Sequence, residues 1–255
     1  MKSNPSDWYK HDWSLDIKNM SWVEDTESQV DFIIKTLNLN GTEKILDLAC
    51  GYGRHALSFA RRGYEVVGVD ITKEYIEDAE KTAKEEALNA RFILSDIRDV
   101  KFQNEYDVVL NMADGAIGYL ENDEENLKIF DIIGRALKSG GKHFMDVCSA
   151  EHAEACFPKR YWEIGKKEFS FAQFEWSAEN RTMLFAGGGF RYGETASRPA
   201  DPSEFVGNPT RLYSTEELAD IFEQRGMEIV ETFSDYTGKE ASNKELQLIV
   251  YSQKI

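Results

Sequence analysis

The sequence predicts an α/β fold whose main part is a doubly wound, mostly parallel sheet. Between residues 26 and 148, five short apolar segments alternate with amphipathic segments of helical spacing. This alternation is typical of a parallel sheet covered by helices on both faces. After Cys148 the pattern changes to alternating segments rich in aromatic residues and glycine, which predicts an inserted antiparallel, β-rich cap.

The first elements follow from apolar spacing and from glycine. Residues 26–39 carry apolar side chains at helical intervals, and the apolar run Lys44–Leu48 is the expected first strand. A glycine-containing turn then leads into a helix that stops at Gly63, because glycine commonly terminates helices. Residues 66–69 form the expected second strand, and Asp70 closes it.

The next helix starts at Thr72, a plausible N-cap. A later helix, with Leu137 on its inner face, is expected to end at Gly140 and Gly141. The remaining strands of this part are expected over 92–94, 106–112 and 142–148.

The end of the chain returns to the helix-and-strand pattern. Ser214 and Glu217 form a predicted capping box for a helix that ends at Gly226. Two last strands follow over 228–233 and 246–251. The predicted parts are an N-terminal arm and helix (1–40), a cofactor-binding core (41–150), the cap (151–213), and a C-terminal helix with the last two strands of the core (214–255).

Charge and composition exclude several classes of protein. The formal net charge of −16 disfavours a nucleic-acid partner, since such binding depends on neutralising phosphates. The first residues lack the apolar core of a signal peptide, and no stretch approaches the ~20 apolar residues of a membrane span. We therefore expect a cytoplasmic protein without membrane contact. Its three cysteines should be free thiols, and no pair has the spacing of a zinc site. Nothing in the sequence indicates an oligomeric state.

The run ILDLACGYGRHA, residues 45–56, joins an apolar strand to a helix through a glycine turn. Glycine lets the backbone approach a ligand closely, so Gly51 and Gly53 are the expected contact points. The spacing of Gly51, Gly53 and Ala56 also fits the dinucleotide pattern, so the turn alone does not separate NAD from other adenosine ligands. An ordinary tight turn is the structural alternative.

Two acidic residues end the next strands. Asp70 is placed to accept hydrogen bonds from ribose hydroxyls, with a helix-capping role as the alternative. Asp96 is placed to accept from an adenine amino group, with a solvated loop position as the alternative.

These segments resemble a known family. ILDLACGYGR resembles the first motif of the class I S-adenosylmethionine-dependent methyltransferases, VVGVD the second, and SDIRD the adenine-contacting third. The resemblance continues through residues 106–120, 137–147 and 211–230 to the closing strand, so it covers the chain from about Ile45 to its end except for the cap. Taken in order, these motifs are far more specific than any one of them. The family's fold is a Rossmann-like sheet of seven strands whose seventh strand is antiparallel.

The resemblance implies S-adenosylmethionine as cofactor and S-adenosylhomocysteine as its product. Asp47 and Gly51 would lie by the methionine part, Asp70 on the ribose, and Asp96 with Ile97 on the adenine. Other expected cofactor-binding positions are Ala49, Tyr52, Gly53, Ile71, and the wall residues Asn111 and Met112. Ala49 departs from the family, which usually has glycine there.

The residues that would bind the methyl acceptor are marked less specifically by the sequence. Asp114 and Tyr119 follow the fourth strand, where ligands bind in such sheets, although both residue types also cap or pack the next helix. The cap offers further candidates, mostly aromatic residues that would otherwise form its core: Tyr161, Trp162, Arg191, Tyr192, Arg211 and Tyr213. Methyl transfer needs positioning more than a catalytic side chain, so no catalytic residue is assigned.

The N-terminal segment concentrates aromatic residues: Trp8, Tyr9, Trp13 and Trp22. Aromatic faces attract a sulfonium cation, so Tyr9 and Trp22 are candidate cofactor contacts if this segment folds over the site as a lid. The commoner explanation is an arm packed on the surface of the domain.

The sequence therefore predicts an S-adenosylmethionine-dependent methyltransferase that methylates a small molecule by in-line transfer. An NAD-dependent oxidoreductase is one alternative. A non-catalytic module that binds S-adenosylmethionine is the other.

Overall fold

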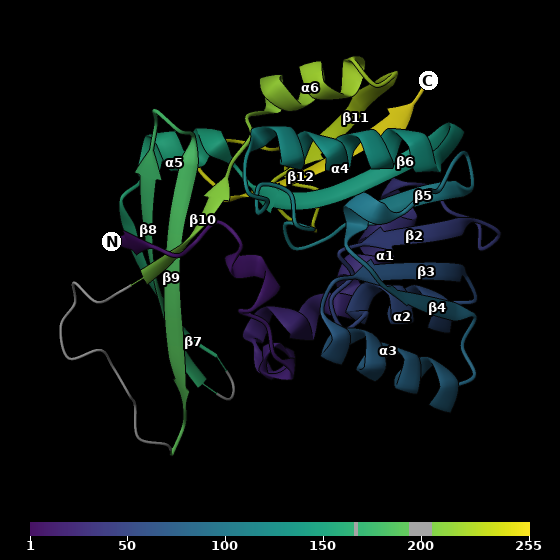
Figure 1. Cartoon of the computed structure of the whole chain (residues 1–255), viewed down its shortest axis with the longest axis horizontal. Coiled ribbons are helices and arrows are strands. Elements are labelled where there is room, and N and C mark those ends of the chain that lie inside the picture. Colours follow the sequence, from purple (N-terminus) through teal and green to yellow (C-terminus); the bar gives the residue numbers. More distant parts are fainter. Residues whose placement is uncertain (166–167, 194–205) are drawn as a thin grey trace.

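The computed structural model describes residues 1–165, 168–193 and 206–255 and contains two sheets (Figure 1). The larger has seven strands in the order β11-β12-β6-β5-β2-β3-β4. Its strands are β2 (Lys44–Leu48), β3 (Glu65–Asp70), β4 (Ala90–Leu94), β5 (Tyr106–Asn111), β6 (Leu137–Cys148), β11 (Met227–Phe233) and β12 (Gln247–Lys254). Strands β2 to β6 pair in parallel, whereas β12 is antiparallel to both β6 and β11. The expected antiparallel seventh strand is thus confirmed.

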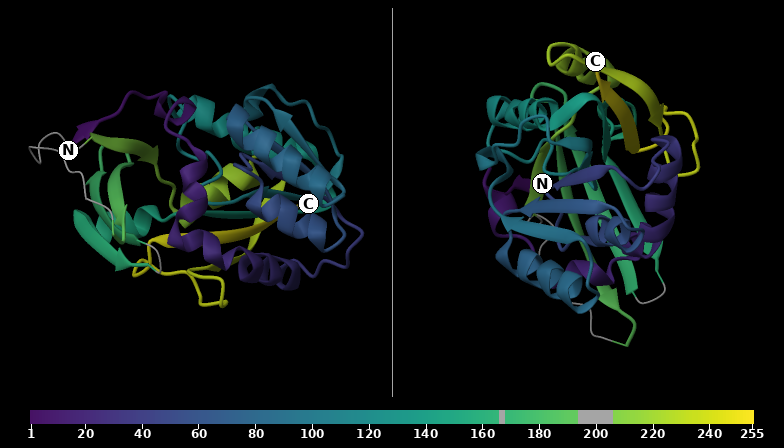
Figure 2. Two further views of the ribbon diagram at one scale, coloured as in Figure 1. Left: turned by 90° about the horizontal axis from the view of Figure 1, so that it is seen from below. Right: turned by 90° about the vertical axis from the view of Figure 1, so that its right-hand side faces the viewer.

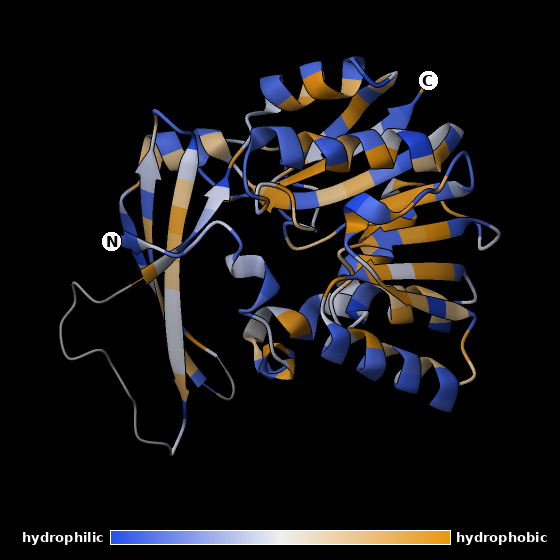
Figure 3. Cartoon of the chain, in the orientation of Figure 1, coloured by the Kyte–Doolittle hydropathy of each residue, from blue (hydrophilic) through white to orange (hydrophobic). Residues whose placement is uncertain are grey.

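Helices cover both faces of this sheet, as the doubly wound prediction requires. One face carries α1 (Thr26–Thr36), α2 (Arg54–Arg61) and α3 (Lys73–Glu85), whose apolar side chains share one buried cluster with Ile45 and Leu110. The other face carries α4 (Asp123–Ala136) and α6 (Thr215–Glu223), whose cluster includes Leu46 and Val109. Hydropathy follows this layering, because the strands are mostly apolar and the outer face of α3 is polar (Figure 3).

The second sheet is the antiparallel cap. Its order is β1-β10-β9-β8-β7. It contains β1 (Lys2–Ser3), β7 (Lys159–Ile164), β8 (Glu168–Ser177), β9 (Thr182–Arg191) and β10 (Val206–Arg211), and α5 (Ala150–Cys156) leads into it. Strands β7 to β10 pair antiparallel, whereas β1, from the start of the chain, pairs in parallel with β10.

The N-terminal segment, defined here as residues 1–25, runs from the cap to the core (Figures 1 and 2). It contains three short 3₁₀ helices, η1 (Trp8–Lys10), η2 (Leu15–Asn19) and η3 (Ser21–Asp25); η4 (Ile97–Asp99) lies in the core. Trp8 Nε1 donates to the Pro209 carbonyl of the cap at 3.1 Å, and Tyr75 of α3 donates to the Ser14 carbonyl at 3.0 Å. The segment is therefore attached to both sheets.

The expected ends of α1 and α4 and the expected start of β6 at residue 142 differ from the structure. Helix α1 ends at Thr36 rather than at residue 39, because Asn38 adopts a left-handed conformation with φ of 48°. Helix α4 ends at Ala136, and Leu137 begins β6 by pairing with Tyr106. No terminal glycine is needed there, since the carbonyls of Arg135 and Ala136 accept from the amides of residues 104 and 105.

Thr72 occupies the N-cap position of α3, but its side chain makes no capping hydrogen bond. The capping box of Ser214 and Glu217 is confirmed in full. The cysteines are free thiols. Among the helices of the described ranges, none combines the length and the apolar character that crossing a bilayer requires.

Candidate active site

A cavity opens at the carboxyl ends of β2, β3 and β5, where ligands bind in open α/β sheets. The core and the N-terminal segment both contribute to its wall. The lining residues are Tyr9, Trp13, Ile17, Trp22, Asp47, Ala49, Cys50, Gly51, Tyr52, Arg54, His55, Asp70, Ile71, Thr72, Tyr75, Met112, Ala113, Gly115, Ala116 and Tyr119.

The glycine turn forms the floor of this cavity. Ala49, Gly51 and Gly53 all have positive φ, at 58°, 57° and 79°. Gly51 lines the cavity, whereas Gly53 lies behind it. A Cβ at Gly53 would come within 2.8 Å of the Phe92 ring and 3.2 Å of Ala79, so this glycine lets α2 pack closely on the sheet. Ala49 adopts a left-handed backbone conformation although it is not a glycine.

Asp70 holds the turn from the end of β3. Its carboxylate accepts from the backbone amides of Gly51 and Thr72, each at 2.8 Å. Burial raises the pKa of Asp70, and these two hydrogen bonds oppose the rise. The carboxylate therefore organises the cavity floor, and Asp70 also lines the cavity.

Asp47, at the end of β2, is the least satisfied group of the site. It is buried, and neither carboxylate oxygen has a hydrogen-bond partner among the residues that the structure describes. Burial raises the pKa of Asp47 to about 7, against the opposing positive charge of Arg54. A buried carboxylate without a donor costs on the order of 1–3 kcal/mol. The ammonium group of an amino acid would satisfy it, which fits the methionine end of the cofactor.

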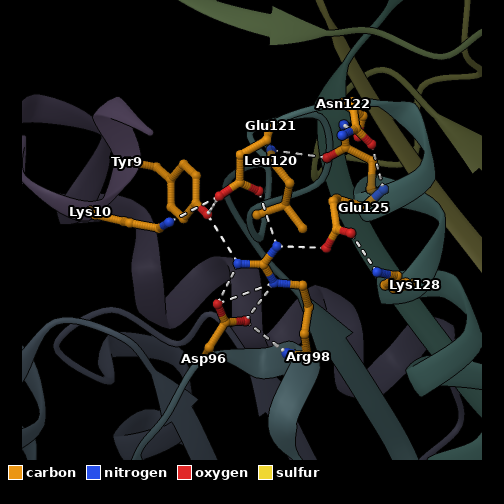
Figure 4. Close-up of polar contacts among 10 residues, drawn as sticks. Tyr9, Lys10, Asp96, Arg98, Leu120, Glu121, Asn122, Glu125 and Lys128 are labelled. Atoms are coloured by element: carbon orange, nitrogen blue, oxygen red, sulfur yellow. Dashed lines mark hydrogen bonds and ion pairs between the residues drawn. The ribbon is translucent and has the colours of Figure 1, made fainter. Parts of the chain in front are cut away.

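The N-terminal segment closes the other side of the cavity with Tyr9, Trp13, Ile17 and Trp22. Figure 4 shows how Tyr9 is held: its hydroxyl donates to Glu121 at 2.8 Å and accepts from Arg98 at 3.2 Å. The predicted aromatic contacts Tyr9 and Trp22 are thus both brought to the site.

Asp96 and Ile97 are placed differently from the other cofactor candidates. The Asp96 carboxylate is bound by the guanidinium of Arg98 at 2.6–3.1 Å and by the Arg98 amide at 2.9 Å (Figure 4). Ile97 is buried in the core, and neither residue lines the cavity. In this arrangement Asp96 anchors Arg98, which in turn holds Tyr9 over the cavity.

Asn111 also lies behind the cavity. Its amide donates to the carbonyls of Leu48 and Gly115, at 3.4 and 3.0 Å, and its oxygen lies 3.3 Å from His143 Nε2. Met112 and Ile71, by contrast, line the cavity as the sequence predicts.

The loop after β5 is conformationally strained. Ala113, Asp114, Gly115 and Ala116 all have positive φ, between 52° and 68°. A non-glycine residue in this region costs roughly 1–2 kcal/mol. The Asp114 carboxylate holds the loop by accepting from Tyr119 Oη at 2.9 Å and from the Cys148 amide at 3.2 Å. Burial raises the pKa of Asp114 to about 6.

Of the predicted acceptor residues, only Tyr119 lines the cavity, and Asp114 stands directly behind it. Arg211 pairs with Asp123 and Glu217 and lines a separate polar cavity. The remaining candidates lie elsewhere: Tyr213, whose hydroxyl donates to Asp123, and the cap residues Tyr161, Trp162, Arg191 and Tyr192.

Several lining residues were not predicted as site residues. Arg54 directly follows the glycine turn, and this position was the available indication for it. Trp13 belongs to the aromatic cluster of the N-terminal segment. No sequence pattern marks Ile17, Thr72, Tyr75 or Ala116, because only tertiary packing brings them to the cavity.

Comparisons with known proteins agree with this geometry. A family model described as a methyltransferase domain matches residues 45–141. The YqeM protein of Bacillus subtilis, a methyltransferase by its name, is 25% identical over 83% of this chain and 84% of its own length. The glycine/sarcosine N-methyltransferase of Aphanothece halophytica is 28% identical over 50% of this chain and 48% of its own.

Two solved structures share the fold. One is an S-adenosylmethionine-dependent methyltransferase from Clostridium acetobutylicum, with a TM-score of 0.73, 20% identity, and 90% and 92% of the two chains covered. The other is CcbJ from Streptomyces caelestis, with a TM-score of 0.74, 16% identity, and coverage of 91% and 95%. These similarities give no support to a dehydrogenase. The family model and the relatives show that residues 45–141 form a methyltransferase domain and that this chain is an S-adenosylmethionine-dependent methyltransferase, and the solved structures show that its fold is shared with such enzymes.

Proposed function

We propose that this methyltransferase transfers the methyl group of S-adenosylmethionine to a small-molecule acceptor. The observation that carries this proposal is the closure of the cavity by Tyr9, Trp13, Ile17 and Trp22, which limits the size of what can enter. The net charge of −16 further disfavours an RNA acceptor. Among structures of similar fold is a didemethyltoxoflavin N1-methyltransferase of Burkholderia thailandensis, with a TM-score of 0.61, 13% identity, and 100% and 92% of the two chains covered.

For the cofactor, we propose contacts from three strand ends. Asp47 takes the ammonium of the methionine part, and Gly51 lies beside it. Asp70 accepts from the ribose hydroxyls with the lone pairs that its two backbone hydrogen bonds leave free. Ile71 and Met112 pack against the adenosyl group and the sulfonium. Asp96 and Ile97 stay candidates for the adenine end, with Asp96 already bound to Arg98.

For the acceptor, we propose that Tyr119 faces the nucleophile. The cofactor supplies an electrophilic methyl group, and the protein holds the acceptor in line with it. An acceptor that must lose a proton can pass it to the Tyr119 hydroxyl, whose own proton moves to Asp114 along the 2.9 Å hydrogen bond.

The decisive experiment uses S-adenosylmethionine labelled at the methyl carbon, incubated with the protein and with separate small-molecule, RNA and protein fractions of a cell extract. Label should appear in the small-molecule fraction, and the Asp47→Asn variant should transfer far less of it. Label confined to the RNA or protein fraction would refute the small-molecule proposal.

The ribose assignment has its own test. Calorimetry should show 1:1 binding of S-adenosylhomocysteine. Because a charged hydrogen bond contributes about 1.5–3 kcal/mol, Asp70→Ala should weaken this binding by at least tenfold. Undiminished binding would remove Asp70 from the site.

A further inference from the structure

Strand β7 is the outermost strand of the cap sheet (Figure 1). It pairs with β8 over all six of its residues in an unbroken antiparallel register. Within the described ranges no strand pairs with its other side. That side therefore presents a row of backbone N–H and C=O groups without strand partners, which is a template for pairing with another strand.

The side chains of β7 add an apolar surface to this edge. Tyr161, Trp162 and Ile164 are 49%, 63% and 69% exposed. The Trp162 ring stacks on Phe169 of β8, with 5.9 Å between the ring centres, and Phe169 contacts Phe190 of β9 at 5.3 Å. A ladder of aromatic rings thus crosses the sheet and ends at its open edge. An exposed, apolar edge strand of this kind promotes association with another chain.

The other sheet edges of the described structure have features that hinder such pairing. At the opposite edge of the cap lies β1, which has only two residues. In the seven-stranded sheet, the edge strand β11 carries Glu228 and Glu231 and has an irregular register next to Ile229. The other edge strand, β4, has one large apolar side chain that is exposed, Leu94 at its end. Short strands, charges and bulges all protect edges, and β7 has a longer and more apolar edge than these strands.

The sequence of β7 is complementary to itself when a second copy lies antiparallel across this edge. In the register that places Tyr161 opposite Tyr161, a two-fold axis perpendicular to the sheet keeps opposite residues on the same face. Arg160 then lies opposite Trp162 in two symmetric contacts, which allows cation–π pairing. Lys159 lies opposite Glu163, also twice, so that opposite charges meet. No like charges face each other in this register.

We propose that two copies of this chain associate through β7 and join their cap sheets into one continuous antiparallel sheet. The partner is a second copy because every position from 159 to 163 then meets a favourable residue of the same strand. Such an interface is closed by its two-fold symmetry, so it produces a dimer rather than a filament. No residue of β7 lines the active-site cavity, so the dimer leaves both cavities as they are in the single chain.

The test measures molar mass by sedimentation velocity at increasing protein concentration. The unmodified chain should reach twice the mass of one chain at about 100 μM, because a dimer with a Kd of ~10 μM is mostly formed there. Tyr161→Lys places two lysines opposite each other, and Trp162→Lys places a lysine opposite Arg160. Each variant should raise the dissociation constant of the dimer by about tenfold or more, because like charges directly opposite destabilise strand pairing.

Two further proteins make the test specific. The double variant Arg160→Glu with Trp162→Lys restores opposite charges across the edge and should recover dimerisation. Leu94→Lys, at the edge strand β4 of the other sheet, is the matched control and should leave the dissociation constant unchanged. Thermal unfolding checks that each variant folds.

Three results would overturn the proposal. The first is the mass of a single chain for the unmodified protein at about 100 μM. The second is a dimer that neither lysine variant in β7 weakens, or that Leu94→Lys weakens equally, because another surface would then hold it. The third is a double variant as monomeric as Trp162→Lys alone, which would contradict the antiparallel pairing about Tyr161.

Discussion

The seven-stranded core and the five-stranded cap bury their strands to different degrees. In β2 and β5 nearly every residue is buried, whereas in β8 every residue is only half-buried. A strand buried on both faces is a continuous apolar run in the sequence and has little choice of position. The position of a half-buried strand depends instead on the elements that pack against its exposed face. The strands that carry the cavity floor therefore belong to the fully buried core, whereas the cap, whose strands are half-buried, does not line the cavity.

The two walls of the cavity show the same difference. The floor comes from consecutive residues of the β2 turn and from Asp70 with its neighbours. The opposite wall comes from the N-terminal segment, whose contacts reach residues about 60 to 200 positions away. Local sequence determines the first wall, and long-range packing determines the second.

The largest expected effect breaks the contact between the loop after β5 in the core and strand β10 of the cap. A Cβ at Gly118, where φ is +84°, would come within 2.0 Å of the Arg211 carbonyl oxygen at the end of β10. Gly118→Ala should therefore lower the free energy of unfolding by about 3 kcal/mol or more. Urea unfolding measures this. The control is Gly41→Ala, which has positive φ but open space around it and should cost about 1 kcal/mol. Equal losses of unfolding free energy in the two variants would show that the close approach of Gly118 to Arg211 adds no cost of its own.

The next prediction concerns Asp47 in the floor of the cavity, where one substitution should change stability and ligand affinity in opposite directions. The pKa of Asp47 is raised to about 7 in the folded protein, from an ordinary value of 3.8. A raised carboxyl pKa means that the folded state binds the proton more tightly, so stability is lost as pH rises from about 4 to 7. At pH 8, Asp47→Asn should stabilise the ligand-free protein by about 2 kcal/mol or more and weaken S-adenosylhomocysteine. Thermal unfolding at pH 8 and calorimetry measure the two effects. Loss of stability in this variant would contradict the assignment of an unpaired carboxylate.

The same pKa predicts how affinity depends on pH. The ammonium of the ligand needs an ionised Asp47, so affinity for S-adenosylhomocysteine should fall below about pH 7 and level off above it. Asp47→Asn should remove most of this dependence. Calorimetry between pH 5.5 and 8 decides the matter, and an equally steep profile in the variant would assign the dependence to another group.

A smaller effect tests the strained loop. Tyr119→Phe removes the hydroxyl that donates to Asp114, so one oxygen of this carboxylate loses its hydrogen bond. The free energy of unfolding should fall by about 1–2 kcal/mol near pH 8. The pKa of Asp114, already about 6, should rise further, because the lost hydrogen bond lowers it. Carbon-13 NMR of labelled aspartate measures the shift. A lower pKa in the variant would show that another donor replaces Tyr119.

The smallest effect concerns the surface of the N-terminal segment. Lys18 pairs with Asp78 of α3 at a partly exposed position. Exposed ion pairs contribute about 0–1 kcal/mol, so Lys18→Ala should barely change urea unfolding or S-adenosylhomocysteine affinity. A large loss of affinity would show that this pair, rather than Tyr9 and Trp8, keeps the segment closed.

Sequence patterns were sufficient to predict the strands of the core and the residues that form the floor of the cavity. Apolar runs of strand length located β2, β3 and β5, the glycine turn and the acid at the end of β3 located Gly51 and Asp70, and the family resemblance added Asp47. The same reasoning gave no reliable placement for Asp96 and Asn111. Both residues lie at the expected strand ends. The carboxylate of Asp96 is bound by Arg98, however, and the side-chain oxygen of Asn111 lies against His143, so neither side chain lines the cavity.

What the sequence by itself determined is the α/β order of elements, the parallel sheet and the glycine turn that lines the cavity. These depend on periodicity and on backbone conformations of neighbouring residues. Only the tertiary structure decided that Tyr9, Trp13 and Trp22 line the cavity and that Arg54 and Asp47 both reach it without forming an ion pair with each other. The physical reason is that burial, and with it the cost of an unpaired charge, depends on residues that are distant along the chain.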